Sequence, residues 1–288
     1  MNDTWIGVAT GLLLSFWGGY LLTGWLLSPL QKAFVGAGFV RPNYRGESIP
    51  VGMGVALWLG MFFTGGLFLL ADEVVEIPWA MVRDMVVVLV VGTSFLVVGL
   101  LDDAVGNREA TGLRGHVRKL LREREVTTGL LKAVTGGFIG VVAAWLLGAE
   151  GWHFALDALV VALTANSINL LDLRPGRACK GVLLVLAVVG FFSLRGIDSP
   201  VYWLLLGATV AYLPEDLGAR MMLGDAGSNL LGGGVGVLVL VSCGTTGILA
   251  WGIFLVLFHL YAEKYSLTET IERNRLLRWL DVLGRRTA

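Results

Sequence analysis

Residues 81–101 read MVRDMVVVLVVGTSFLVVGLL, and Asp102 and Asp103 follow at once. An apolar run of about 20 residues is long enough for an α-helix to cross the hydrocarbon core of a bilayer. Inside lipid, the backbone of such a segment satisfies its hydrogen bonds only as a helix or in a closed barrel. We therefore predict a membrane-spanning helix that ends at a pair of carboxylates.

Eight further apolar runs follow the same pattern. They occupy residues 5–27, 50–71, 130–148, 152–171, 181–194, 201–213, 229–241 and 248–261. The runs at 181–194, 201–213 and 229–241 are short for a full crossing, which needs about 20 residues. Together the nine runs predict an all-α, polytopic membrane protein with about nine transmembrane helices.

The composition excludes several other classes of protein. Of the 288 residues, 56% are hydrophobic, 40 are glycine and only 15% are charged, and the mean hydropathy is +0.75. Average soluble domains contain about 25% charged residues and about 7% glycine. A disordered chain, a coiled coil, a disulfide scaffold and an ordinary soluble enzyme are therefore excluded. The formal net charge is zero, which by itself says nothing about nucleic acid. For this membrane protein we expect no nucleic-acid partner.

The distribution of basic residues predicts the orientation of the helices. One set of alternate loops comprises residues 28–49, 102–129, 172–180, 214–228 and the segment from 262 onward. With Lys132, this set carries 20 of the 22 lysines and arginines, and the opposite loops carry only Arg83 and Arg195. Because cytoplasmic loops collect Lys and Arg, we expect the N-terminus outside and the C-terminus in the cytoplasm.

The last 26 residues differ from the rest. We divide the chain into an integral membrane domain at residues 1–262 and a cytoplasmic tail at residues 263–288. In the tail, Ser266 and Glu269 have the spacing of a capping box, and apolar residues then recur at helical spacing with arginines between them. This pattern predicts a basic amphipathic helix that either lies on the inner leaflet or packs against the cytoplasmic loops.

Three polar motifs lie at the cytoplasmic ends of the predicted helices. They are Asp102-Asp103, Asn166-x-x-Asn169-x-x-Asp172 and Gly224-Asp225-Ala-Gly-Ser228. The spacing of the second motif places its two amides and its carboxylate on one helix face. Each motif also has a structural interpretation: a solvated helix end, polar contacts between helices, and a glycine-rich turn. None of the three decides the function alone.

Considered together, the motifs indicate phosphate chemistry. Mg²⁺ is typically held by one or two carboxylates and substrate phosphates, and Asp225 suits that role. Ser228 and the N–H groups that open the next helix can receive an anion. Basic residues face the same side, and they are Arg108, Arg114, Arg118, Lys119, Arg122, Arg124 and Lys132. We therefore expect Mg²⁺-dependent chemistry on a substrate that is half lipid and half water-soluble.

These segments resemble the polyprenyl-phosphate N-acetylhexosamine-1-phosphate transferase family. That family includes the phospho-N-acetylmuramoyl-pentapeptide transferases and the UDP-N-acetylglucosamine:undecaprenyl-phosphate transferases. The resemblance covers residues 1–262. It rests on the three motifs above and on two stretches of the first cytoplasmic loop, Arg41-Pro-Asn43-Tyr-Arg45-Gly and Ile49-Pro-Val-Gly-Met-Gly54.

The resemblance implies a reaction and a set of partners. A UDP-sugar would donate its sugar 1-phosphate to a polyprenyl phosphate such as undecaprenyl phosphate, with release of UMP, in cell-envelope glycan synthesis. The expected cofactor is Mg²⁺, and the expected partners are the polyprenyl lipid, the UDP-sugar, membrane lipids and a second copy of the chain as a homodimer. The protein would act at the cytoplasmic face of the bacterial plasma membrane.

The expected roles of individual residues follow the motifs. Asp225 and Asp102 would bind the metal, and Asp102, Asp103 and Asp172 would be catalytic. Substrate-binding residues would be Asn43, Arg45, Lys119, Lys132, Asn166, Asn169, Arg174, Arg177 and Ser228. Whether one aspartate acts as a general base or as a nucleophile stays open, because a polyprenyl phosphate is already ionised at pH 7.

The chain also departs from the pattern of the family. Pro175 stands where the family has a second aspartate, and Arg174 and Arg177 appear beside it, either as phosphate ligands or as ordinary loop charge. The histidine-rich motif of the last cytoplasmic loop is absent, and the amphipathic tail replaces a tenth helix. A second hypothesis is therefore a binding or scaffold protein that holds a polyprenyl lipid without transferring sugar. A transporter is disfavoured, because no ionisable residue lies near the middle of a predicted span.

Overall fold

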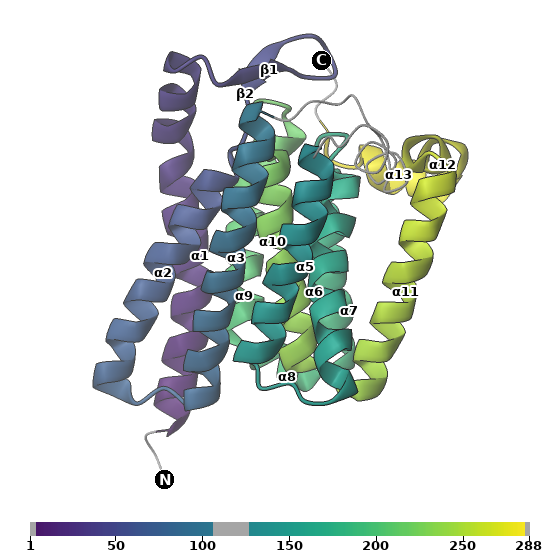
Figure 1. Ribbon diagram of the computed structural model, residues 1–288. Coiled ribbons are helices and arrows are strands. Elements are labelled where there is room, and N and C mark those ends of the chain that lie inside the picture. The colour runs from purple at the N-terminus through teal and green to yellow at the C-terminus, as the bar shows by residue number, and fades with distance from the viewer. Residues whose placement is uncertain (1–3, 106–126, 286–288) are drawn as a thin grey trace.

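The computed structural model describes residues 4–105 and 127–285, and these fold into twelve helices and one short β-hairpin (Figure 1). Seven of the helices are long and apolar enough to cross a membrane. These are α1 (Thr4–Gly36), α2 (Gly54–Val75), α3 (Trp79–Val105), α5 (Thr128–Leu146), α6 (Trp152–Leu171), α10 (Gly224–Ser242) and α11 (Thr245–Lys264). The chain is a multi-pass, all-α membrane protein, as the apolar runs predict.

Two of the nine predicted runs fold into helices that are not among the seven that are long and apolar enough to cross a membrane. They form α7 (Arg177–Phe192) and α9 (Pro200–Leu217), of 16 and 18 residues. At 1.5 Å per residue these helices extend about 24 and 27 Å. The last turn of α9 carries Glu215 and Asp216, and the short helix α8 (Leu194–Ile197) joins α7 to α9. The number of nine crossings therefore stays a prediction.

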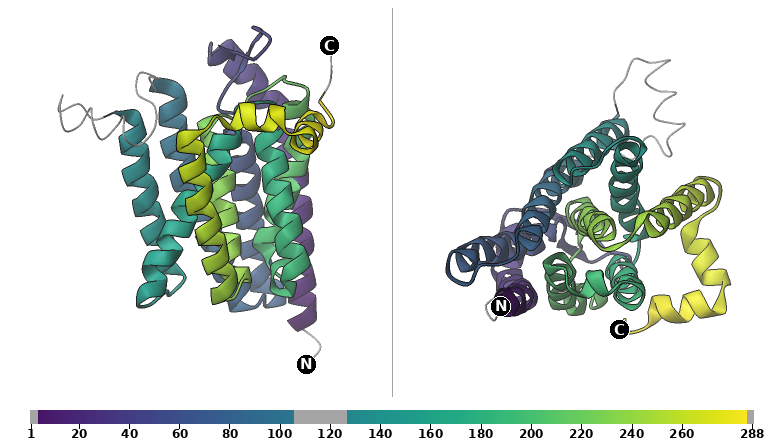
Figure 2. Two further views of the ribbon diagram at one scale, coloured as in Figure 1. Left: turned by 90° about the vertical axis from the view of Figure 1, so that its right-hand side faces the viewer. Right: turned by 90° about the horizontal axis from the view of Figure 1, so that it is seen from below.

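Helix α10 is the central element of the bundle. It packs mainly against α3 and α6 and also touches α2, α7 and α9, and the view along the bundle places it among the other helices (Figure 2). Its residues from Ala226 to Val239 are all buried. A helix that is apolar on all sides and buried on all sides belongs in the middle of a membrane bundle.

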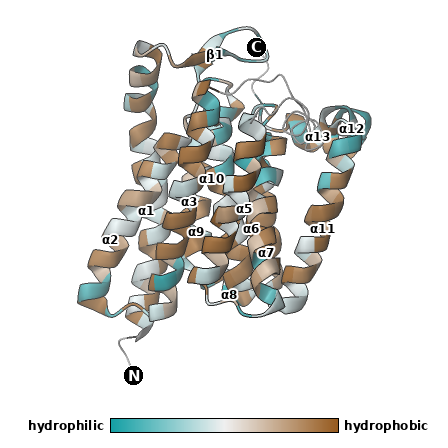
Figure 3. Cartoon of the chain, in the orientation of Figure 1, coloured by the Kyte–Doolittle hydropathy of each residue, from teal (hydrophilic) through white to brown (hydrophobic). Residues whose placement is uncertain are grey.

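The outer helices present apolar side chains to their surroundings. Trp25, Phe138 and Leu260 are each more than 60% exposed, and the outward mid-sections of the helices are predominantly hydrophobic (Figure 3). Hydrophilic residues gather at the ends of the bundle, above all at the end that carries the β-hairpin. This is the distribution expected of a protein whose middle lies in lipid.

We call that end of the bundle the hairpin end. The hairpin consists of β1 (Val40–Pro42) and β2 (Ser48–Pro50), an antiparallel pair in which Val40 faces Pro50. The end of α3, the start of α5, the end of α6 and the start of α10 lie beside it, whereas the start of α1 lies at the opposite end (Figure 1). The predicted motifs therefore meet at one end.

The tail forms two helices where the sequence predicted one. They are α12 (Leu267–Arg273) and α13 (Arg275–Val282). The expected cap is present, since Ser266 Oγ accepts a hydrogen bond from the backbone N–H of Glu269. The chain then becomes extended at Asn274, whose side chain accepts from the backbone N–H groups of Leu276 and Leu277. The division arises because Asn is a strong N-cap and starts a second helix.

Candidate active site

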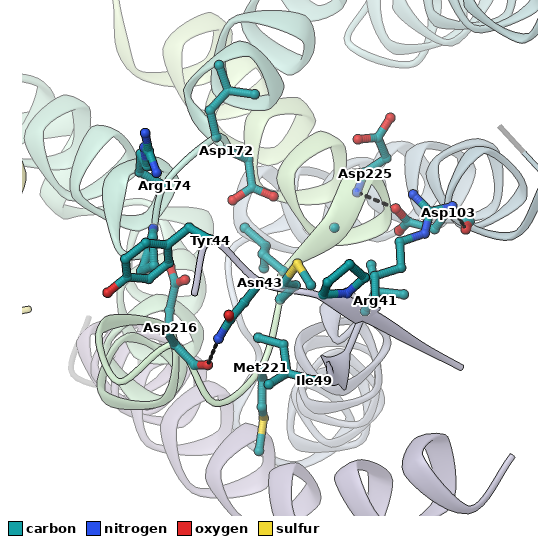
Figure 4. Close-up of a pocket in the computed structure, with 18 of the residues that line it drawn as sticks. Arg41, Asn43, Tyr44, Ile49, Asp103, Asp172, Arg174, Asp216, Met221 and Asp225 are labelled. Atoms are coloured by element: carbon teal, nitrogen blue, oxygen red, sulfur yellow. Dashed lines mark hydrogen bonds between the residues drawn. The ribbon is translucent and has the colours of Figure 1, made fainter. Parts of the chain in front are cut away.

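Asp103 fixes the start of α10 to the end of α3. Its Oδ1 accepts a hydrogen bond from the backbone N–H of Asp225 (Figure 4) and its Oδ2 accepts one from the backbone N–H of Ala226, each at 3.0 Å. The Asp103 side chain is buried. A carboxylate that holds the free N–H groups of a helix N-terminus makes charge-assisted hydrogen bonds and interacts favourably with the helix dipole. Both oxygens of Asp103 are thus committed to this contact.

Glycine residues permit the close approach of the neighbouring helices. A Cβ atom on Gly99 of α3 would lie 2.3 Å from the carbonyl oxygen of Asp225, and one on Gly54 of α2 would lie 2.2 Å from Gly227 Cα. The backbone N–H of Gly54 also donates to Leu223 O at 3.1 Å. The two helices therefore hold the first turn of α10 in a fixed position.

Lys132 bridges two of the predicted metal-binding carboxylates. It lies in the second turn of α5, and its ammonium contacts the Asp225 carboxylate directly. Its Nζ lies 3.9 Å from Asp102 Oδ2. The three side chains are between 16% and 29% exposed. The carboxylates of Asp102 and Asp225 therefore converge on one position, which the lysine cation occupies.

Asn169 and Ser228 complete this cluster. The Asn169 amide lies 2.8 Å from Ser228 Oγ, 2.9 Å from Asp225 Oδ1 and 2.8 Å from Lys132 Nζ. With its nitrogen toward the two oxygens and its oxygen toward the ammonium, every contact is a hydrogen bond. Ser228 also donates to Gly224 O at 2.9 Å. The polar motifs of α6 and α10, which are about 60 residues apart in the chain, thus form one network.

A cavity of about 530 Å³ opens beside this network. Five carboxylates and two guanidinium groups of the described residues line it, and they are Asp102, Asp103, Asp172, Asp216, Asp225, Arg41 and Arg174. Figure 4 shows Asp103, Asp225 and Arg41 on one side of the cavity and Tyr44, Arg174 and Asp216 on the other, with Asp172 between them. The excess of negative charge suits a cation or a hydrogen-bond-donating ligand.

The excess of negative charge in the cavity acts on Asp172, which has three other carboxylates near it. It caps the C-terminus of α6 and lines the cavity. Burial raises its pKa well above the ordinary value, and the negative charges of Asp216, Asp225 and Asp103 raise it further. A bound cation or a ligand with donor groups would relieve this repulsion.

Asp216 lines the cavity, although no motif of the sequence predicts it. It lies in the last turn of α9, it is 4% exposed, and its Oδ2 has no hydrogen-bond partner in the part of the chain that the structure describes. The one available signal was an acidic pair at the end of an apolar run. A chain length of 44 residues between Asp172 and Asp216 hides their proximity from any sequence pattern.

The donor set is compatible with Mg²⁺. In residues 4–105 and 127–285, no three His, Cys, Asp or Glu side chains stand close enough to hold a metal alone. Asp102 and Asp225 nevertheless both reach the same cation. Mg²⁺ is usually bound by one or two carboxylates, with waters and substrate phosphates as the other ligands. The two carboxylates fit that mode of binding, with phosphate oxygens supplied by the substrate.

Several predicted substrate-binding residues make other contacts. Asn43 lines the cavity, and its side chain also organises the hairpin turn by accepting the backbone N–H groups of Arg45 and Glu47. Arg45 does not line the cavity, and its Nε donates to Tyr44 OH at 2.8 Å. Lys119 lies outside the described residues.

Two more predicted residues face neighbouring helices. Asn166 Nδ2 lies 3.0 Å from His259 Nε2 on α11, so its amide links α6 to α11. Arg177 is buried against the tail, where its guanidinium pairs with Asp281. Neither residue lines the cavity, and of the two loop arginines only Arg174 does.

The chain is similar in sequence to known transferases. Over 225 residues, the chain is 29% identical to the phospho-N-acetylmuramoyl-pentapeptide-transferase of Desulforudis audaxviator. The matched region covers 70% of this chain and 62% of that protein. The protein of the same name from Heliobacterium modesticaldum is 26% identical over 78% of the chain and 71% of its own length. The chain is a distant homologue of the phospho-N-acetylmuramoyl-pentapeptide transferases.

Other matches to these transferases are shorter. The Thermotoga neapolitana protein is 30% identical over 152 residues, which are 50% of this chain and 49% of that protein. The matched regions therefore span 49% to 71% of the length of these relatives. No protein-family model matches it.

Proposed function

We propose that this protein transfers a sugar 1-phosphate from a UDP-sugar to a polyprenyl phosphate, with Mg²⁺ as cofactor and UMP as leaving group. The observation that carries the proposal is the convergence of Asp102 and Asp225 on the Lys132 cation beside an acidic cavity. The distant homology to the phospho-N-acetylmuramoyl-pentapeptide transferases supports the same class of reaction.

The position of the cavity supports a substrate that is half lipid. Its walls are the ends of α3 and α6, the start of α10 and the β-hairpin, so it opens where the bundle meets water. A polyprenyl chain in the bilayer would place its phosphate at this depth. Because 20 of the 22 lysines and arginines fall in one set of alternate loops, we assign this end to the cytoplasmic face of the plasma membrane.

The reaction requires one bond to form and one to break. An oxygen of the polyprenyl phosphate attacks the sugar-linked phosphorus of the donor, and the bond from that phosphorus to the bridging oxygen breaks. UMP leaves with the electron pair of the broken bond. No proton has to be removed from the attacking phosphate at pH 7, so positioning and charge neutralisation are the main tasks of the site.

The side chains divide these tasks. Asp225 and Asp102 would hold Mg²⁺, which when bound neutralises charge on the donor diphosphate. Lys132 would bind a phosphate oxygen of the donor or of the lipid. Asp103 accepts hydrogen bonds from two backbone N–H groups in the first turn of α10, so contacts within the protein hold the backbone of Asp225 in place. We therefore treat Asp103 as a positioning residue.

The opposite side of the cavity would bind the water-soluble donor. Arg174 lies with its guanidinium 5.9 Å from the centre of the Tyr44 ring, which offers a flat aromatic surface and a cation together. Asp216 supplies a carboxylate acceptor on the same side, and Asp172 supplies one between the two sides. Hydroxyl and N–H groups of a nucleotide sugar are suitable partners for such acceptors.

A second candidate function has its own observation. Lys132 already neutralises Asp102 and Asp225, and Pro175 replaces a family aspartate in the cavity wall. A protein with a permanently neutralised centre could bind a polyprenyl phosphate without transferring sugar. This scaffold hypothesis differs from the first in one respect, because it predicts lipid binding without turnover.

The test is UMP release by the purified protein with undecaprenyl phosphate, Mg²⁺ and a panel of UDP-sugars. We expect release with at least one donor, loss of release with EDTA, and loss in Asp225→Asn. Asp198→Asn is the matched control, because Asp198 is exposed at the end of α8 and should leave activity unchanged. Lipid binding in the wild type without UMP release from any donor would favour the scaffold hypothesis.

A further inference from the structure

The tail is fastened to one wall of the cavity. Residues 172–176, which connect α6 to α7, contribute Asp172, Leu173, Arg174 and Pro175 to that wall. The carbonyl oxygen of Pro175 accepts a hydrogen bond from Arg285 Nε at 2.8 Å. Immediately after the turn, Arg177 donates to both oxygens of Asp281 on α13, at 2.8 and 3.1 Å. Arg177 is only 6% exposed, so this pair is enclosed by the protein.

A second set of bonds holds the same contact. Lys180 Nζ donates to the carbonyl oxygens of Leu280 and Asp281, at 3.0 and 2.7 Å, in the last turn of α13. The Arg177 guanidinium also donates to Thr268 Oγ1 on α12 at 3.2 Å. The first turn of α7, which directly follows the cavity wall, is thus held from outside by both tail helices.

The opposite side of α13 is apolar and uncovered. At about 100° per residue, Leu276, Trp279, Leu280 and Leu283 project on one side of the helix, centred roughly 150° from Asp281. They are 65%, 56%, 41% and 50% exposed. We call these four residues the tail ridge. The polar side of α13 docks on the protein, whereas the tail ridge faces away from the docking contact.

The location of the tail identifies what the ridge meets. Seen along the bundle, α12 and α13 lie outside the outline of the other helices (Figure 2), and they cross the direction of the bundle at its hairpin end (Figure 1). A bilayer around the apolar bundle would therefore lie beneath these two helices. Arg275 is exposed beside the ridge on α13, and Arg273 and Arg278 are exposed elsewhere on the two tail helices. Exposed Trp and Leu with flanking Arg are typical of a helix that lies in the interface of an anionic bilayer.

We propose that α12 and α13 form a membrane-bound strap, in which the tail ridge binds the surface of an anionic bilayer and the Arg177–Asp281 pair transmits that anchorage to the cavity wall. The strap gives the bilayer a means to order residues 172–176. The inference that the membrane orders the cavity wall rests on the proposed function in one respect, because it treats the cavity as the substrate site. The partner is the headgroup layer of the membrane in which the protein is embedded.

The first experiment measures membrane contact in the full chain. Leu276→Cys, in a Cys243→Ser background with Cys179 left buried, is labelled with the fluorophore NBD in nanodiscs of phosphatidylcholine, with or without phosphatidylglycerol. Glu47→Cys on the exposed hairpin turn is the matched control label. We expect quenching of the label at position 276, but not at 47, by lipids spin-labelled near the headgroup, with at least a twofold increase in phosphatidylglycerol. Equal quenching by aqueous iodide at the two positions would overturn the proposal.

The second experiment measures the transmission to the cavity wall. Hydrogen exchange of residues 172–180 is followed in the wild type, in Asp281→Asn and in the control Glu263→Gln, which alters an exposed carboxylate at the end of α11. We expect at least tenfold faster exchange in Asp281→Asn and no change in the control. Trp279→Ser, which leaves the docking contact intact, should raise exchange only in nanodiscs that contain phosphatidylglycerol. Exchange rates that are the same in all three variants and in both lipid compositions would refute the strap. Both readouts are independent of sugar transfer, so a failure of the proposed transferase activity would not affect them.

Discussion

Lys132 on α5 and Asp225 at the start of α10 are in direct contact, although 93 residues separate them in the chain. The same ammonium lies 3.9 Å from Asp102 Oδ2. A cation bound by these two carboxylates would occupy the region that Lys132 fills. Because two like charges at the same carboxylate oxygens repel each other strongly, we expect binding of Mg²⁺ to displace Lys132. Displacement would free the ammonium to bind a phosphate.

This competition predicts the effect of Lys132→Met on metal binding. Removal of the lysine leaves Asp102 and Asp225 without their cation, so an added divalent ion should bind about tenfold more tightly, which corresponds to about 1.4 kcal/mol. Titration with Mn²⁺, monitored by electron paramagnetic resonance in detergent, measures this affinity without any need for turnover. UMP release should fall in the same variant, because the phosphate then lacks its ammonium partner.

The matched control is Lys32→Met, which removes an exposed lysine from the last turns of α1. Its Mn²⁺ affinity should equal that of the wild type. An unchanged or weaker affinity in Lys132→Met would mean that the metal binds elsewhere and that Lys132 does not compete with it.

The role of Asp103 as a positioning residue predicts a loss of stability. In Asp103→Asn, one carboxylate oxygen becomes an NH₂ group that faces a backbone N–H of Asp225 or Ala226. A lost charge-assisted bond and an unsatisfied buried donor cost about 1–3 kcal/mol. The thermal midpoint of the variant in detergent should therefore fall clearly below that of the wild type.

Asp225→Asn distinguishes stability from chemistry. The Asp225 side chain contacts Lys132 and takes no part in the two backbone bonds to Asp103, so its replacement should abolish UMP release with a smaller change in midpoint. Equal midpoints for Asp103→Asn and the wild type would contradict the positioning role.

The sequence predicted the fold class and the region of the site for identifiable physical reasons. Apolar runs report membrane helices directly, and seven of them are confirmed as helices able to span. The three polar motifs meet at one end because α3 and α6 run toward the hairpin end and carry their motifs at their C-termini, whereas α10 starts at that end and carries its motif at its N-terminus. Asp102, Asp225, Lys132 and Asn169 are consequently neighbours, although whether they bind metal and substrate stays a prediction.

The contacts of individual side chains could not be predicted from the sequence. Arg177 and Arg174 lie three residues apart in the same basic turn, yet one pairs with Asp281 and the other lines the cavity. Their separation depends on where α13 docks, which no local pattern encodes. Asp216 was missed for a related reason, because its importance comes from its proximity to Asp172 across the cavity and not from its neighbours in the chain.

The glycine contacts around α10 predict a sharp difference between two similar substitutions. Gly99→Ala would place a Cβ 2.3 Å from the carbonyl oxygen of Asp225, so α3 and α10 must separate and the carboxylate network must shift. We expect a large loss of folded protein after extraction and no UMP release. Gly137→Ala on α5 meets nothing within 4 Å and should raise stability by up to about 1 kcal/mol through helix propensity. Fluorescence-detected size exclusion after heating compares the two, and similar behaviour would argue against a close helix contact at Gly99.

The ion pairs of the tail predict how docking depends on pH. Burial alone would raise the pKa of Asp281, but the hydrogen bond from Arg177 and the charges of Arg177 and Arg285 outweigh it, so the pKa lies below its ordinary value. A carboxyl group with a depressed pKa in the docked state stabilises docking at every pH above its undocked value of about 3.9. That contribution disappears as the pH falls through the lowered pKa. A spin label on Leu277→Cys, which projects on the docking side of α13, should therefore stay immobile from pH 8 to about pH 4.5 and become mobile only in stronger acid, whereas in Asp281→Asn it should be mobile throughout. A label on Glu47→Cys reports general unfolding in the same samples, and release of the tail near pH 6 would show that another group controls docking.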